Sequence, residues 1–224
     1  MLDIPLIISI AFIGTTVLTF WLFWKSSRFC KPVLWVSIVW LMLHGILAFS
    51  GFYQNLEARP PRITLTLGPS ILFIVLLFSF EKGRSWIGQL NLKWLTLLHI
   101  IRVPVELILY ALFVQKVIPE LMTFTGRNWD ILAGITAPLV YYFGYVQGTL
   151  GRKFILFWNV LCLSLLLNIV VNALLSTPLP FQQFAFEQPN RALFYFPFIW
   201  LPAYVVPVVL LSHVIVIYRT MKTP

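Results

Sequence analysis

The sequence predicts an all-α polytopic membrane protein, folded as one bundle of about seven transmembrane helices. Of its 224 residues, 60% are hydrophobic and only 10% are charged, and the mean hydropathy is +0.90. Soluble domains carry about 25% charged residues. The apolar residues gather in seven segments of about the length that crosses a bilayer. We therefore expect residues 1–224 to form one transmembrane domain in the cell membrane, with the lipid bilayer as its main partner.

The expected membrane helices follow one another with short connections. Several of them contain prolines, among them Pro69, Pro104, Pro138 and Pro207. A proline inside a helix frees a carbonyl, which a neighbouring group must satisfy at membrane depth. The seven segments are approximately residues 4–24, 33–53, 63–80, 93–115, 129–147, 154–176 and 192–218.

The start of the chain and the two cysteines indicate no processing and no disulfide framework. The first residues have neither a basic region nor a small-residue cleavage pattern, so they predict a first membrane helix and not a removed signal peptide. Cys30 lies in a basic loop and Cys162 within an apolar segment. Two cysteines in such different settings are expected to be free thiols.

The positive charges predict an orientation. Lysines and arginines cluster in alternate connections, whereas cations in the other connections are nearly balanced by acids. Cytoplasmic loops carry the excess of cations, so the N-terminus should be outside and the C-terminus cytoplasmic. The net charge of +9 is spread over loops and does not indicate nucleic-acid binding. The expected cytoplasmic cations are Lys25, Arg28, Lys31, Lys82, Arg84, Lys93, Arg152, Lys153, Arg219 and Lys222.

The fourth segment carries a polar stripe. His99, Arg102 and Glu106 fall within about 60° of one another on a helix, because successive residues turn by about 100°. A charge at membrane depth costs roughly 2.5–3.5 kcal/mol on insertion scales, so this face should point into protein or a wet cavity. Arg102 and Glu106 are four residues apart and are expected to pair. Pro104 lies between them.

Helix rise converts sequence position into depth. His99, His213 and Asn159 each lie six residues from a cation at the expected inner boundary, or about 9 Å into the core. Arg102 and His44 lie nearer the middle. Glu106, Asn168 and Asn172 lie in the outer half. The sequence thus predicts a ladder of polar groups, without showing that they converge.

Several members of this ladder have two interpretations. Asn168 and Asn172 either join helices by hydrogen bonds or bind a ligand. His44 either bonds a backbone carbonyl or belongs to the site, and His213 either faces headgroups or belongs to the site. Asp130 is expected to cap a helix N-terminus. The loop 177–191 either lies on the membrane surface or forms a lid over an outer cavity.

The favoured function is that of a small-solute or proton-coupled transporter. Arg102 would hold an anionic or polar solute, and Glu106 and His99 would titrate. Kinked helices would allow one part of the bundle to rock against the other. The candidate ligand-binding residues are His99, Arg102, Glu106, Asn168, Asn172, His44 and His213.

The alternative is a membrane-embedded enzyme, or a haem or metal protein, that acts on a lipid-soluble substrate. Glu106 and His99 would be its acid and base, and His99 and His213 its metal or axial haem ligands. The sequence contains no H-E-x-x-H, P-loop or G-x-S-x-G motif. Catalytic activity, cofactor and solute therefore remain unassigned at this stage.

Overall fold

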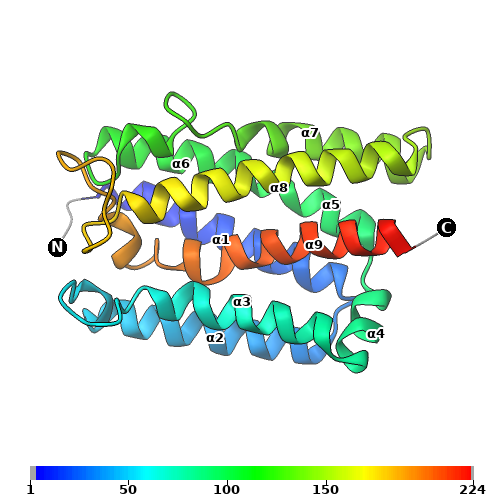
Figure 1. Cartoon of the computed structure of the whole chain (residues 1–224), viewed down its shortest axis with the longest axis horizontal. Coiled ribbons are helices and arrows are strands. Elements are labelled where there is room, and N and C mark those ends of the chain that lie inside the picture. Colours follow the sequence, from blue (N-terminus) through cyan, green and yellow to red (C-terminus); the bar gives the residue numbers. More distant parts are fainter. Residues whose placement is uncertain (1–3, 223–224) are drawn as a thin grey trace.

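The computed structural model describes residues 4–222, and this part of the chain is helical without strands. Helical rods run side by side along the long axis of the molecule (Figure 1). The α-helices are α1 (Leu6–Ser26), α2 (Lys31–Phe49), α3 (Thr64–Ser79), α4 (Glu81–Gln89), α5 (Leu92–Leu98), α6 (Arg102–Val114), α7 (Ile131–Tyr141), α8 (Arg152–Leu175) and α9 (Val206–Lys222).

The prediction of an all-helical fold is confirmed. The helices found in the seven expected membrane segments are not all long enough to cross a membrane. Within the described residues, five helices are long and apolar enough to cross a membrane. Helices α3 and α4 would count as a sixth span, but the chain bends by 95° between them. The segment Ile131–Val146 is apolar and shorter. The five long helices are Leu6–Ser26, Lys31–Phe49, Leu92–Val114, Arg152–Leu175 and Leu201–Lys222.

Two predicted boundaries were wrong. The second segment was expected to reach Tyr53, but α2 ends at Phe49 and the chain turns at Gly51, whose φ of 74° suits glycine. The last segment was expected to begin at residue 192. Its helix begins at Leu201, after a stretch that contains Pro197. Proline lacks the N–H that a continuous helix needs there.

Three of the rods contain turns that are not α-helical. A 3₁₀ turn (η2, His99–Ile101) joins α5 to α6, directly before Pro104. A π turn (η4, Tyr142–Val146) follows α7, and another (η6, Leu201–Val205) precedes α9. Pro207 cannot bond the carbonyl of Ala203, and the Trp40 indole N–H donates to that oxygen at 2.8 Å. A neighbouring helix thus satisfies this freed carbonyl, as expected.

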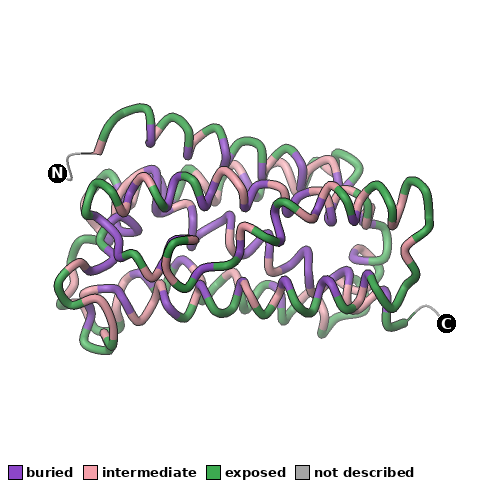
Figure 2. Tube along the Cα trace, turned by 90° about the horizontal axis from the view of Figure 1, so that it is seen from above, coloured by how far each residue is buried: buried purple, intermediate pink, exposed green. Residues whose placement is uncertain are grey.

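Helix α9 is the central element of the bundle. In its most apolar stretch 72% of the residues are buried, against at most 50% in the other four long helices. Buried residues line the inner sides of the rods, and exposed residues line the outer sides (Figure 2). Many exposed side chains are large and apolar, including Val36, Phe49, Leu72 and Phe157. An apolar exterior is the arrangement that a bilayer favours.

Most connections between the helices lie at the two ends of the bundle. At one end, the backbone N–H of Asn91 donates to the Ser26 carbonyl at 2.8 Å, and Arg152 donates to the Met221 carbonyl at 3.1 Å. At the other end, the Arg191 N–H donates to the Val117 carbonyl at 3.0 Å. α1 begins at this second end and α9 finishes at the first (Figure 1). Which end is cytoplasmic remains a prediction.

Candidate functional site

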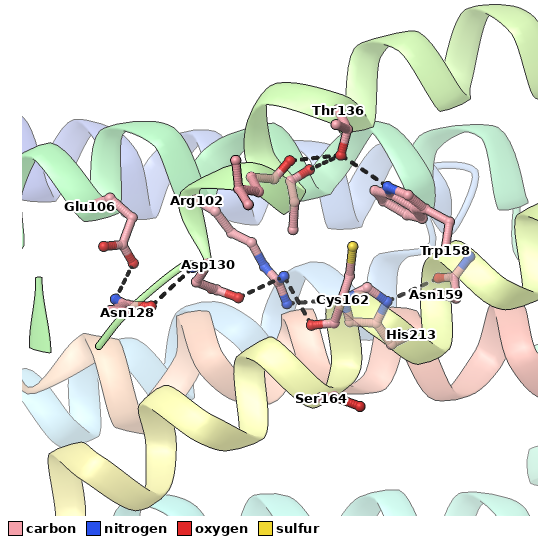
Figure 3. Close-up of polar contacts among 12 residues, drawn as sticks. Arg102, Glu106, Asn128, Asp130, Thr136, Trp158, Asn159, Cys162, Ser164 and His213 are labelled. Atoms are coloured by element: carbon pink, nitrogen blue, oxygen red, sulfur yellow. Dashed lines mark hydrogen bonds and ion pairs between the residues drawn. The ribbon is translucent and has the colours of Figure 1, made fainter. Parts of the chain in front are cut away.

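Arg102 lies at the centre of a buried group of polar side chains and is 2% exposed. Its Nη1 lies 2.9 Å from Asp130 Oδ1 in an ion pair and donates to the Cys162 carbonyl at 3.2 Å. Its Nη2 donates to His213 Nε2 at 3.0 Å. The guanidinium thus joins four rods, α5–α6, α7, α8 and α9 (Figure 3).

His213 is held in one tautomer by these contacts. The guanidinium has only donors, so His213 Nε2 must accept the hydrogen bond from Arg102. His213 Nδ1 lies 2.9 Å from Asn159 Oδ1, and Asn159 Nδ2 donates to the Ile155 carbonyl at 2.8 Å. His213 Nδ1 therefore carries the proton and the ring is neutral. A second proton would displace Arg102 from the ring.

His99 stacks on His213 and has no polar partner in the protein. The two ring centroids are 3.8 Å apart and the planes differ by 15°. The Trp158 ring packs edge-on against His99 at 5.6 Å. His99 is fully buried, yet neither of its ring nitrogens has a hydrogen-bond partner among the described residues. A buried donor without a partner costs about 1–3 kcal/mol, which marks the ring as a candidate functional group.

Glu106 is bound by an asparagine that also positions Asp130. Asn128 Nδ2 donates to Glu106 Oε1 at 2.5 Å and to the Met122 carbonyl at 3.0 Å. Asn128 Oδ1 accepts the backbone N–H of Asp130 at 3.1 Å. One side chain therefore connects the Glu106 carboxyl group to the backbone of Asp130 (Figure 3). The second Glu106 oxygen, Oε2, has no partner in the described part of the chain.

The prediction that Arg102 pairs with Glu106 was wrong, because Arg102 forms its ion pair with Asp130. Asp130 does occupy the N-cap position of α7, but its side chain makes no capping bond. The buried loop before α7 returns toward the middle of the bundle, and its residues Ile118, Met122 and Asn128 are at most 1% exposed. Helix α7 therefore starts at the level of Arg102.

Small residues allow α7 to approach this level closely. Ala133 and Ala137 are fully buried. A Cβ added to Gly134 would lie 2.8 Å from the Val103 backbone nitrogen and 3.2 Å from the Arg102 Cβ. These distances are too short for a side chain at residue 134. Glycine at this position thus sets the spacing that brings Asp130 within reach of Arg102.

We call this group the Arg102 cluster, and its charges do not balance if every acid is ionised. Arg102 contributes one positive charge, His213 is neutral, and Asp130 cancels Arg102. A second negative charge on Glu106 would have no cation paired with it. The cluster therefore favours one proton on its carboxyl groups. Its members are His99, Arg102, Glu106, Asn128, Asp130, Asn159 and His213.

The other sequence candidates lie outside this cluster. Asn168 is exposed and donates to the Arg127 carbonyl at 2.9 Å. Asn172 donates to the Asn168 carbonyl at 2.9 Å and to its side-chain oxygen at 3.1 Å. Asn168 thus connects α8 to the loop before α7, whereas the Asn172 amide bonds within α8 itself, so neither bond joins two helices. The loop 177–191 packs on the loop after α6, where Gln188 donates to the Ile118 carbonyl.

His44 forms a separate contact on α2. Its Nδ1 lies 2.6 Å from the Tyr53 hydroxyl, and the Trp40 ring packs against it at 4.4 Å. The partner is therefore a side chain and not the backbone carbonyl that one interpretation assumed. Tyr53 is 1% exposed, and this burial raises its pKa to about 12.

The arrangement of the histidines does not suit the metal or haem interpretation. Axial haem ligands point ring nitrogens at one iron from opposite faces, whereas His99 and His213 stack face to face. Both ring nitrogens of His213 are already engaged. Among the described residues, no three His, Cys, Asp or Glu side chains lie close enough to hold a metal ion.

Sequence reasoning placed Asn159 at the right depth and misjudged Asp130 and Asn128. A usable signal was present. The fifth apolar segment is among the shortest of the seven, its helix covers only Ile131–Val146, and Arg127, Asn128 and Asp130 precede it. A short apolar helix with polar residues before it starts inside the bundle, so those residues lie at depth.

The fold and the cluster define an all-helical bundle with a buried ion-pair site that contacts its central helix through His213. Residues 60–221 match the family described as a domain of unknown function, DUF8737, and the chain belongs to that family. The match contains the whole Arg102 cluster and leaves out α1 and α2. No curated protein and no solved structure matches the chain.

Proposed function

We propose that this protein is a multi-pass carrier of the cell membrane that moves a small anionic solute together with protons. Seven rods would cross the bilayer, with the N-terminal end outside and the C-terminal end cytoplasmic. The apolar outer faces and the cation-rich loops at one end support this placement. Fusions of a reporter after Lys222 and within loop 177–191 should label opposite sides, and labelling of the same side would contradict it.

The observation that carries the proposal is the buried guanidinium of Arg102, held by Asp130 and His213 in a cluster with unsatisfied groups. Arg102 Nε, Glu106 Oε2 and both His99 nitrogens lack a partner in the described part of the protein. A charged group this deep in a membrane bundle marks a pathway for ions or protons. Arginine also binds carboxylates and phosphates in a planar, bidentate manner.

The proposed coupling is a competition for Arg102. A proton that binds Asp130 removes the negative charge that faces the guanidinium, which is then available to an anionic solute. Release of the solute restores the ion pair and expels the proton. Glu106 and His99 would exchange protons with the two sides of the membrane. His213 stays neutral as long as Arg102 donates to its Nε2.

The test is uptake into proteoliposomes. Radiolabelled succinate, citrate, glutamate and phosphate are offered with and without an imposed proton gradient. At least one anion should accumulate only with the gradient, and Glu106→Gln should abolish the pH dependence of uptake while leaving the fold intact. Gradient-independent uptake, or an unchanged pH profile in Glu106→Gln, would contradict the proposed coupling.

A second candidate function is an embedded enzyme that acts on a lipid-soluble substrate. An apolar pocket of about 510 Å³ between α2 and α3 favours it. However, neither His99 nor Glu106 lines this pocket. Visible absorption, metal analysis and lipid mass spectrometry of the purified protein distinguish the candidates. A Soret band, a stoichiometric metal or a chemically altered lipid would support the enzyme.

A further inference from the structure

The pocket between α2 and α3 lies on the opposite side of α9 from the Arg102 cluster. Tyr204, Pro207, Val208 and Leu211 of the η6–α9 rod line it, whereas His213 faces Arg102. Helix α2 contributes Pro32 to Trp40 and α3 contributes Pro69 to Leu77. Each set covers nine residues, or eight helical steps, so the pocket is about 12 Å long from the α4 end toward the middle of the bundle.

Its walls offer a ligand almost no hydrogen bonds. The Ser37 hydroxyl accepts from the Tyr204 hydroxyl at 3.0 Å, and the Ser70 hydroxyl donates to the Thr66 carbonyl at 3.1 Å. The Trp40 indole N–H donates to the Ala203 carbonyl. The remaining lining is mostly aliphatic and aromatic. A polar solute would lose its hydration without compensation here, so the pocket selects a hydrocarbon.

The open end of the pocket lies beside cations. Pro32 lines the pocket directly after Lys31, and Trp86 of α4 lines it two residues after Arg84. A second hollow shares Phe73 and Leu77 with the pocket and is lined by Lys82 and Glu81. Lys82 and Glu81 thus lie beside the end at which the chain bends by 95° into α4, with Lys31 next to a lining residue and Arg84 bound to the carbonyls of Phe78 and Ser79. This charge favours an anionic headgroup.

We propose that the α2–α3 pocket binds one hydrocarbon chain of an anionic membrane lipid, whose headgroup lies on the cations beside α4. The inference rests on the proposed placement in a bilayer and is independent of solute transport. The hydrocarbon chain of the lipid takes the place of side-chain contacts between α2 and α3. It also packs against the π turn η6 of the central rod. Lipid occupancy therefore stabilises this half of the bundle.

The experiment measures lipid retention. The protein is reconstituted in vesicles of phosphatidylcholine and phosphatidylglycerol, re-extracted in mild detergent, and analysed by native mass spectrometry. Wild-type protein should retain phosphatidylglycerol in preference to phosphatidylcholine. Ser70→Phe fills the pocket and should weaken retention by about tenfold, since displacing even two methylene groups has that effect.

Two matched controls separate this site from general lipid contact. Ser164 on α8 also bonds the carbonyl four residues earlier, but it is exposed and lies outside the pocket, so Ser164→Phe should retain lipid normally. Lys82 and Lys153 are both exposed at the same end. Lys82→Gln should reduce the preference for phosphatidylglycerol, and Lys153→Gln should not.

Equal retention by Ser70→Phe and Ser164→Phe would overturn the inference, as would equal retention of the two lipids by wild-type protein. If Ser70→Phe does not fold, Ser70→Leu fills less of the pocket and should give a smaller loss in the same direction. Loss of lipid with normal anion uptake would leave the transport proposal intact. Normal lipid retention without any anion uptake would contradict the transport proposal and leave the lipid proposal intact.

Discussion

The two sides of α9 differ in how they use buried space. On the side of α6, α7 and α8, polar groups are packed tightly around Arg102, and a glycine is needed for the helices to fit. On the side of α2 and α3, the walls are apolar and leave a pocket of about 510 Å³. The difference indicates that the first side is held in one fixed geometry, whereas the second side leaves room for a further apolar group.

The largest expected loss in the free energy of unfolding comes from breaking the Arg102–Asp130 ion pair on the tightly packed side. Arg102→Ala or Asp130→Ala leaves one buried charge without its partner, which typically lowers the free energy of unfolding by about 3–5 kcal/mol. The double change Arg102→Met with Asp130→Leu removes both charges and should restore most of that loss. Unfolding in mixed micelles measures both effects. Equal destabilisation by the single and double variants would contradict the pairing.

A smaller effect is expected at Asn128, which connects the Glu106 carboxyl group to the backbone of Asp130. Asn128→Ala leaves a buried oxygen of Glu106 without its donor, which costs about 1–3 kcal/mol. The control is Asn168→Ala, since Asn168 is exposed and bonds only backbone and a second asparagine. In the same unfolding assay, Asn168→Ala should lower the free energy of unfolding by much less than Asn128→Ala does. A larger loss for Asn168→Ala would show that the outer helix contact matters more than the cluster.

Two helical glycines test the packing contrast directly. Gly134→Ala would force α7 away from Val103 and should cost about 1–3 kcal/mol. An added Cβ at Gly68 on α3 meets nothing within 4 Å. Gly68→Ala should therefore be neutral or raise the free energy of unfolding by about 0.5–1 kcal/mol. Comparable losses for the two variants would remove the distinction between a tight and a loose side.

The smallest expected effect is a pH dependence at Tyr53, in the connection between α2 and α3. Its folded pKa of about 12 lies above the ordinary value of 10.0. The contribution of Tyr53 is therefore fully present below pH 10 and is lost as the pH rises toward 12. Tyr53→Phe should lessen the fall in stability across that window. Superimposable curves for wild type and Tyr53→Phe would contradict the shift.

The sequence was sufficient for the all-helical fold and for the matched level of His99, His213 and Asn159, because apolar length and helix rise determine both. It correctly indicated that the faces of His99, Arg102 and Glu106 turn inward. It did not predict the partner of Arg102, since the four-residue spacing to Glu106 is a local signal. Asp130 reaches Arg102 only because a buried loop and Gly134 bring α7 to that depth. Such long-range contacts have no periodic signature in the chain.

The central claim is that the Arg102–Asp130 pair belongs to the transport mechanism and is more than a structural contact. The most direct measurement is gradient-driven anion uptake by the double variant Arg102→Met with Asp130→Leu, reconstituted beside wild-type protein at matched density. The account predicts a folded variant, with an unfolding midpoint close to that of wild type, that takes up no anion at any pH. A folded double variant that retains wild-type uptake and its pH profile would contradict the claim.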